Sequence, residues 1–216
     1  HFVLCLPDGT RTPVTLALPG RHNVQNALAA SAVAWQLGVG NDAIARALEH
    51  FAGIGRRFNQ LAKLSLPGGG HAILVDDYGH HPKELAAVFE AARGGWPDKR
   101  LVVAFQPHRY SRTRDLFDEF AAVLSSVDAL VLTEVYPAGE ALIAGADGKS
   151  LARAIRTRGR VDPVVVGNAG ELTGVLADVL RDGDLLLMMG AGDIGQAAQQ
   201  LARHGFTASG TEQDKH

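Results

Sequence analysis

The sequence contains a single cysteine, Cys5, so no internal disulfide can form, and such low cysteine use suits a reducing cytoplasm. No uninterrupted apolar run approaches the roughly 20 residues that a membrane-spanning helix needs, and no secretion signal opens the chain. The formal net charge of −2 argues against a general nucleic-acid binder, which normally carries a basic excess. Neither a membrane nor a nucleic acid is therefore expected as a partner. Cys5 lies in an apolar run and is expected to be a buried, inert thiol.

Two ligand-binding patterns are also absent. The sequence has no Gly-x-x-x-x-Gly-Lys-Ser/Thr phosphate loop, so if ATP is used, its main phosphate cradle is expected outside this chain. The nine histidines show no His-x-x-x-His pattern, and no Cys-x-x-Cys pair occurs. His80 and His81 are adjacent and would point apart on a strand, so a zinc site is not expected.

Apolar residues make up 46% of the 216 residues, enough for one large domain or about one and a half ordinary ones. The chain begins without methionine, inside a strand-like run over residues 2–6, which indicates a fragment whose upstream part is missing. A stretch containing Gly and Arg, residues 51–58, is interpreted as a hinge. We therefore expect one unit over residues 1–57, a second over 58–205 and a mobile polar tail over 206–216.

The pattern of apolar residues predicts an α/β fold. In the first unit we expect a hairpin over residues 2–18 and helices over 24–37 and 41–50, the second capped by Asn41 or Asp42. The second unit should begin with another hairpin over 59–77. The strands expected after it cover residues 101–105, 129–133, 164–166 and 185–189. The helices expected there cover residues 83–92, 114–124, 150–157 (capped by Ser150), 170–180 and 194–203. Short apolar runs that alternate with amphipathic helices are typical of a mostly parallel sheet covered on both faces.

The densest group of ionisable side chains follows a buried strand. Residues 76–82 have the sequence Asp-Asp-Tyr-Gly-His-His-Pro and lead directly into a helical pattern. Ligands of open α/β sheets bind at the carboxyl ends of strands. Two carboxylates, a phenol and two imidazoles are more than a plain turn needs, which indicates a functional site. The alternative is that Asp76 or Asp77 caps the helix while the histidines are solvated.

A second polar cluster, residues 106–114, follows the next strand with the sequence Gln-Pro-His-Arg-Tyr-Ser-Arg-Thr-Arg. Because consecutive strands of a parallel sheet are usually neighbours, we expect this cluster beside the first. Arginine suits bidentate binding of a carboxylate or phosphate. The alternative is that Arg112 and Arg114 only pair with acidic residues of the following helix, namely Asp115, Asp118 or Glu119. Such pairing is expected for Arg114 and fits Arg109 less well.

A glycine-rich turn, residues 190–195, follows the last predicted strand and opens the last helix, as a phosphate-binding turn does. A tight connection between a strand and a helix needs glycines in any case, and this turn follows the last strand rather than the first. The other parts of a dinucleotide-binding fingerprint are missing. A dinucleotide-binding Rossmann module therefore stays as an alternative of a different class.

Four motifs resemble those of the Mur ligases: residues 18–27 (Leu-Pro-Gly-Arg-His-Asn-Val-Gln-Asn-Ala), 55–58 (Gly-Arg-Arg-Phe), 76–82 and 106–113. The resemblance extends from about residue 2 to about residue 204. It implies that residues 1–57 end a central ATPase domain, a partial α/β unit, and that residues 58–205 form a Rossmann-like, amino-acid-binding C-terminal domain. The family's phosphate loop, main Mg²⁺ ligands and UDP-sugar pocket would lie outside this chain, so the chain alone is expected to be inactive.

The last two motifs are most similar to those of the Mur ligases that join L-alanine to UDP-N-acetylmuramate with ATP and Mg²⁺ in peptidoglycan synthesis. The resemblance implies that ATP phosphorylates the muramate carboxylate, that the amine of L-alanine attacks the acyl phosphate, and that phosphate then leaves. Mur ligases that attach a preformed peptide during murein recycling share the Asp-Asp and His-His-Pro features. They remain the nearest alternative.

The resemblance also implies roles at the ATP site. Asn23 and Asn26 would face the adenine, Arg57 would meet ATP phosphate as a catalytic residue, and Asp77 would meet the ribose hydroxyls. Asp76 is a less certain neighbour. For Asn23, an N-cap with a solvated amide remains the open alternative.

On the amino-acid side, the resemblance implies a pocket formed by Tyr78, His80, His108, Arg109 and Arg112. Arg109 and Arg112 would hold the carboxylate of L-alanine. A histidine, His80 or His108, could help to deprotonate the incoming ammonium, because its ordinary pKa lies near 6.5.

Overall fold

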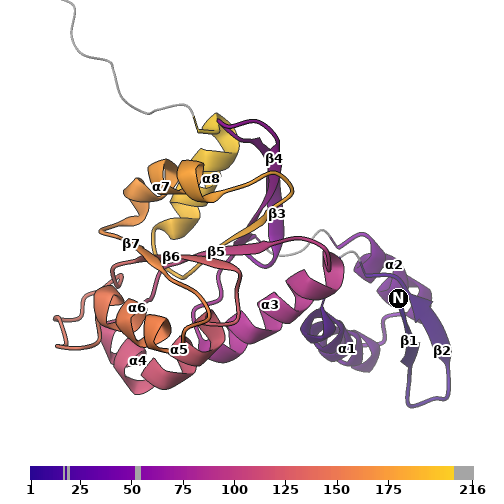
Figure 1. Cartoon of the computed structure of the whole chain (residues 1–216). Helices are drawn as coiled ribbons and strands as arrows, with labels where there is room; N and C mark the ends of the chain where they lie inside the picture. The colour runs from indigo at the N-terminus through magenta and orange to yellow at the C-terminus, as the bar shows by residue number, and fades with distance from the viewer. Residues whose placement is uncertain (17, 19, 52–54, 207–216) are drawn as a thin grey trace, which may run out of the picture.

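The computed structural model describes residues 1–16, 18, 20–51 and 55–206 (Figure 1). Its first part contains β1 (Phe2–Cys5), β2 (Arg11–Val14), α1 (Arg21–Gln36) and α2 (Asn41–Glu49). β1 and β2 form the predicted antiparallel hairpin, and Gly9 supplies the positive φ of 85° that its turn needs. A small core of Leu4, Leu6, Val14 and Ile44 joins this hairpin to α2.

The larger part is built on a six-stranded sheet. In spatial order its strands are β3 (Asn59–Ser65), β4 (His71–Asp77), β8 (Leu185–Met189), β5 (Leu101–Phe105), β6 (Ala129–Thr133) and β7 (Val164–Val166). β3 is antiparallel to β4, and the other pairs are parallel. The expected mostly parallel sheet is confirmed, but β8 lies between β4 and β5, so the assumption that these consecutive strands are neighbours is wrong. All five residues of β8 are apolar and buried, which suits a central strand covered on both faces.

Helices cover both faces of this sheet (Figure 1). One face carries α3 (Pro82–Gly95), α4 (Tyr110–Asp115), α5 (Phe117–Leu124) and α6 (Gly148–Thr157). The other carries the short 3₁₀ helix η1 (Ala169–Glu171), α7 (Leu172–Val179) and α8 (Ile194–His204). Alternate residues of the strands point to opposite faces: Val103 and Leu187 enter the first core, whereas Val102 and Leu186 enter the second. This is the doubly covered, Rossmann-like arrangement that was predicted.

The helix starts differ from several predictions. α1 begins at Arg21 with Gly20 as its N-cap, so Asn23 lies inside the helix and the N-cap alternative for it is wrong. α2 is capped by Gly40 without a side-chain hydrogen bond, rather than by Asn41 or Asp42. The predicted helix over 114–124 is two helices, α4 and α5, that meet at Leu116.

The cap of α6 is Asp147 and not Ser150. Oδ1 of Asp147 accepts the backbone N–H of Ser150 at 2.7 Å, and its Oδ2 accepts the Ser150 hydroxyl at 3.1 Å. Ser150 is the third residue of the helix, where a backbone N–H has no partner within the helix and needs such a cap.

Replacing Asp147 with alanine should therefore lower the free energy of unfolding by about 0.5–2 kcal/mol, the usual loss on removing an N-cap side chain. Urea denaturation of the 216-residue chain measures this difference. Ser150→Ala is the matched control, because it keeps the capped N–H and should cost less. Equal stability of wild type and Asp147→Ala would contradict the assignment of the cap.

The prediction of a buried Cys5 is wrong, because the thiol is exposed. β1 has the alternating burial of a half-buried strand, with Leu4 facing the small core, so its neighbour Cys5 faces outward. Of the expected tail only Phe206 is described, and it packs against the second core. The remainder of the tail and residues 52–54 of the expected hinge lie outside the described residues. In the described part of the chain, no helix is long and apolar enough to span a membrane.

Candidate functional site

A cavity of about 730 Å³ lies between the first part of the chain and α3. Its walls are mostly apolar and include Ala27, Ala30, Leu48, Phe51 and Val88. The four side chains assigned to ATP by motif resemblance line it as well: Asn23, Asn26, Arg57 and Asp77. The structure thus brings together residues from three separate stretches of the sequence. A largely apolar cavity with a few polar groups is the usual form of a small-molecule site, and its volume falls within the common range.

Asp77 is the last residue of β4. Its side chain lines the cavity and accepts hydrogen bonds from the neighbouring backbone. The residue is 3% exposed, and its two carboxylate oxygens accept the backbone N–H of Phe58 at 2.7 Å and that of Gly79 at 2.6 Å. Burial raises the pKa of Asp77, although these two donors and the nearby Arg57 oppose the rise. This carboxyl group therefore holds two segments of backbone in place at the edge of the cavity.

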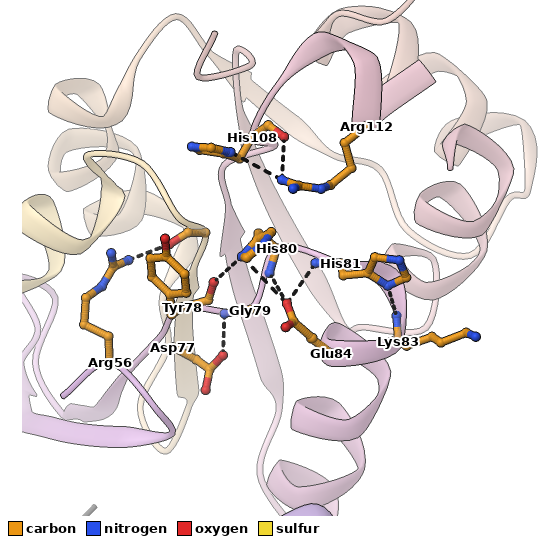
Figure 2. Close-up of polar contacts among 11 residues, drawn as sticks. Arg56, Asp77, Tyr78, Gly79, His80, His81, Lys83, Glu84, His108 and Arg112 are labelled. Carbon is orange, nitrogen blue, oxygen red and sulfur yellow. Dashed lines mark hydrogen bonds and ion pairs between the residues drawn. The ribbon is translucent and has the colours of Figure 1, made fainter. Parts of the chain in front are cut away.

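Neither Asp76 nor Asp77 caps α3, so the capping alternative for this cluster is wrong. His81 is the N-cap, and its Nδ1 accepts the backbone N–H of Lys83 at 3.2 Å. Glu84 completes a capping box by accepting the backbone N–H groups of His80 and His81 at 2.9 and 3.1 Å (Figure 2). Burial opposes ionisation of Glu84, but these hydrogen bonds and the neighbouring His80 lower its pKa.

The capping box also fixes the direction of His80. Its Nδ1 lies 3.0 Å from the carbonyl oxygen of Tyr78 and 3.7 Å from a carboxylate oxygen of Glu84. The two adjacent histidines lie after the strand and not on it, so the strand geometry assumed for them was wrong. Within the described residues, no group of three or more His, Cys, Asp or Glu side chains is arranged to hold a metal ion.

The two polar clusters meet, as the sequence predicted, even though β8 separates their strands. The ring centroids of His80 and His108 are 6.0 Å apart, and His108 stacks on Tyr136 at 5.5 Å. Nη1 of Arg112 lies 3.3 Å from Nδ1 of His108 and donates to the carbonyl oxygen of His108 at 3.1 Å (Figure 2). The loops after β4 and β5 thus place two imidazoles and a guanidinium in one group.

Arg109 lies at the outer side of this group with its guanidinium half exposed, and Nη1 is 4.0 Å from Oε1 of Glu140. Its backbone has a φ of 73°, and its N–H donates to the carbonyl oxygen of Tyr136 at 2.8 Å. Glu140 accepts both the backbone N–H and the hydroxyl of Ser111, at 2.9 and 2.6 Å. The expected pairing of Arg114 is confirmed by its 2.7 Å contact with Asp115.

Burial lowers the pKa of His108, and its electrostatic interactions with Arg112, His80 and Arg109 lower it further. The ordinary histidine pKa is about 6.5, so His108 is a neutral imidazole at neutral pH. A neutral imidazole can accept a proton from a neighbouring group.

The Arg112→Ala variant should raise the pKa of His108, because the substitution removes a nearby cation. The pKa should stay below its ordinary value, since burial is the larger cause of the shift. An NMR titration of the His108 ring protons measures the change. Arg114→Ala, which removes a cation that pairs with Asp115, should leave the His108 titration unchanged. A midpoint that fails to rise in Arg112→Ala would contradict the electrostatic explanation.

The glycine-rich turn after β8 is filled by protein side chains. The amide of Gln106 donates to Asp193 at 2.6 Å and accepts the backbone N–H of Ile194 at 3.1 Å. A Cβ atom at Gly192 would collide with Gln106 and Tyr136, and one at Gly195 would collide with the guanidinium of Arg56. The close approach of these side chains explains the glycines, which favours packing over phosphate binding at this turn.

Sequence reasoning missed three residues of this region: Arg56, Glu84 and Glu140. Glu84 could have been found from its spacing to His81, which is that of a capping box. Glu140 acts on Ser111 across a loop, and no local pattern signals that contact.

A mostly parallel sheet covered on both faces, with its polar site at the carboxyl ends of the strands, defines an α/β ligand-binding domain. The chain belongs to the Mur ligase family, because residues 56–192 match the family model described as "Mur ligase, glutamate ligase domain".

Curated relatives include the UDP-N-acetylmuramate–L-alanine ligase of Xanthomonas campestris pv. campestris (strain B100), which is 73% identical over 209 residues. This match covers 97% of the chain and 44% of the relative. The relative from Xanthomonas axonopodis pv. citri (strain 306) carries the same name and is 73% identical over 206 residues, covering 95% of the chain and 43% of that protein. The chain thus spans less than half the length of the curated relatives it matches.

Among solved structures, UDP-N-acetylmuramate–alanine ligase from Thermotoga maritima matches with a TM-score of 0.71 and 30% identity, covering 91% of the chain and 40% of that protein. A murein peptide ligase from Psychrobacter arcticus matches with a TM-score of 0.61 and 22% identity, covering 92% and 40%. The second likeness shows the fold alone.

Proposed function

We propose that these 216 residues are part of a cytoplasmic, ATP-dependent ligase that joins L-alanine to UDP-N-acetylmuramate in peptidoglycan synthesis. One observation carries the proposal. The cavity, which is large enough for a nucleotide, adjoins the group formed by His80, His108, Arg109 and Arg112, here called the His/Arg cluster, at the same edge of the sheet. The names of the 73% identical relatives support the choice of substrates. Residues 1–57 would end the central ATPase domain, and residues 58–205 would form the C-terminal domain.

ATP would occupy the cavity. Asn23 and Asn26 are three residues apart on α1, so they share one helix face, and an amide can both donate to and accept from an adenine edge. Arg57 would meet the phosphates. Asp77 would accept the ribose hydroxyls, because a carboxylate oxygen that already accepts one N–H keeps a second lone pair. The main ligands of Mg²⁺ would come from the remainder of the protein.

L-Alanine would bind at the His/Arg cluster, beside Tyr78 and His80. Arg109 and Arg112 would hold its carboxylate through charge-assisted hydrogen bonds. His108 would accept a proton from its ammonium, since a neutral imidazole is poised for that step. The deprotonated amine would then attack the muramate acyl phosphate, forming an amide as inorganic phosphate leaves.

A carboxylate is a poor electrophile until one of its oxygens becomes a leaving group, which is why phosphorylation by ATP must come first. Transfer of the γ-phosphoryl group releases ADP and gives the acyl phosphate. The contribution of this chain would then be to position the two substrates and to stabilise their charges.

Phosphate release from ATP tests the proposal, with UDP-N-acetylmuramate and L-alanine present. The 216-residue chain and the full-length ligase proposed to contain it are compared. Turnover by the full-length protein alone, and only with L-alanine, is the expected result. Turnover with a preformed tripeptide in place of alanine would point to a murein-recycling ligase, and no phosphate release by either protein would overturn the proposal.

A further inference from the structure

Arg56 and Arg57 are adjacent in sequence and both lie over the Tyr78 ring, but their other contacts differ. Arg57 lines the 730 Å³ cavity. The guanidinium of Arg56 is inserted among the strand ends instead. There Nη2 donates to the carbonyl oxygen of Gly190 at 2.5 Å, and Nε lies 3.3 Å from the carboxylate of Asp76.

Asp76 makes Arg56 hard to replace. The side chain of Asp76 is 0% exposed, and its carboxylate forms an ion pair with Arg56. The Arg56 side chain is also packed so closely over the α8 start that Gly195 has no room for a Cβ atom. A buried carboxylate without its cation would be strongly destabilised, so this guanidinium has a fixed place in the fold.

The backbone of the same residue sets the end of β4. Arg56 has a positive φ of 62°, and its carbonyl oxygen accepts the N–H of Tyr78 at 2.7 Å. Two residues later, the N–H of Phe58 donates to Asp77. The segment that carries Arg57 is therefore tied by two hydrogen bonds to the segment that carries Asp77 and Tyr78.

The side chain of Arg56 also contacts Tyr78, with its guanidinium carbon 5.0 Å from the ring centroid. The guanidinium carbon of Arg57 also lies 5.9 Å from that centroid, and the ring of His80 meets the Tyr78 ring edge-on at 5.2 Å. Figure 2 shows Tyr78 between Arg56 and His80. A continuous series of contacts thus runs from Arg56 through Tyr78 and His80 to His108.

We propose that Arg56 is a positioning residue that holds the nucleotide site and the acceptor site in one geometry. It sets Arg57 toward the cavity through the backbone and sets Tyr78 toward His80 through its side chain. The inference rests on the proposed function, because that function names the two substrates. Arg56 lies outside both groups of residues assigned to them, so its effect on each substrate is indirect.

The test uses the full-length ligase and begins with wild-type phosphate release that depends on L-alanine. Arg56→Gln should then raise KM for both ATP and L-alanine by roughly fivefold, less than the roughly tenfold or more expected when a direct charge-assisted contact is lost, because the effect of Arg56 is indirect. Arg56→Gln combined with Asp76→Asn replaces the buried pair with two neutral amides. This double variant should recover the melting temperature of the wild type but keep both raised KM values.

The matched control is Arg100→Gln. Arg100 is likewise an arginine of limited exposure beside a buried carboxylate, since its Nε lies 3.8 Å from Asp184, whose side chain is 2% exposed. It contacts the carbonyl oxygen of Val179, away from both proposed sites. Its replacement should lower the melting temperature without changing either KM.

Two results would overturn the inference without contradicting the proposed function, because that function is tested separately by the L-alanine-dependent phosphate release of the wild type. One is recovery of both KM values together with stability in the double variant, which would make Arg56 a purely structural residue. The other is a change in KM for only one of the two substrates in Arg56→Gln. If Arg56→Gln alone does not fold, the double variant decides between these results.

Discussion

Replacing Arg109 with alanine in the full-length ligase is expected to lower kcat/KM for L-alanine by about 10- to 150-fold. This corresponds to about 1.5–3 kcal/mol for one lost hydrogen bond to a charged group. The guanidinium is half exposed and contacts Glu140 only at 4.0 Å, so it is available to a ligand carboxylate. KM for ATP should change little, because Arg109 lies outside the cavity lined by Asn23 and Asn26. Steady-state phosphate release at varied alanine and ATP concentrations measures both values.

Arg114→Ala is the matched control for this variant. Arg114 is in α4, the short helix that begins directly after Arg109, but its exposed guanidinium pairs with the exposed Asp115, so its loss should leave alanine kinetics unchanged. Equal alanine kinetics in Arg109→Ala and wild type would refute the role proposed for Arg109.

Asp77→Ala is expected to lower the free energy of unfolding of the 216-residue chain by about 2–4 kcal/mol. The substitution leaves the buried N–H groups of Phe58 and Gly79 without an acceptor, and each such group costs about 1–3 kcal/mol. Trp96 stacks on Phe58 with ring centroids 5.9 Å apart, so its fluorescence in urea reports on this segment. Asp77→Asn keeps one acceptor oxygen and should lose about half as much stability.

The dependence on pH adds a second test of Asp77. Burial raises its pKa in the folded state, so the folded state binds the proton more tightly than the unfolded state. Stability from this group is therefore lost as the pH rises from the unfolded pKa through the folded pKa. The stability of wild type relative to Asp77→Asn should fall over that window.

The control for Asp77→Ala is Asp115→Ala, at an exposed carboxylate, which should stay within about 0.5 kcal/mol of wild type. An equally small loss of stability in Asp77→Ala would contradict the hydrogen-bonding role of Asp77.

Four strands of the larger part, β5, β6, β7 and β8, could be predicted from sequence with their observed bounds, and β3 and β4 could be predicted as a hairpin. The reason is physical: buried parallel strands are short continuous apolar runs, and the sequence shows where they stop. Helix starts were less predictable. Whether Asp147, Ser150 or His81 caps a helix depends on local backbone geometry, and the sequence contains several suitable side chains at each start.

The order of the strands was not accessible from local patterns, because pairing of β8 with both β4 and β5 is decided by long-range packing. The same limit applies to Arg56 and Glu140, whose partners lie far away in the sequence. For the site, motif resemblance named residues that the structure gathers into a cavity and an adjoining cluster. Their individual roles remain predictions for the kinetic experiments.

The central place of β8 has a consequence for the nascent chain. β8 follows the other five strands of this sheet in the sequence, and until it has left the ribosome, β4 and β5 have no strand between them. The two apolar strands present unpaired edges during that interval, which favours association with other chains or with a chaperone. Pairing across such long sequence separations is also slow. Because His80 follows β4 and His108 follows β5, the two imidazoles can meet only once Leu185–Met189 has been inserted. Synthesis must therefore have passed residue 189 before the two clusters can form one site.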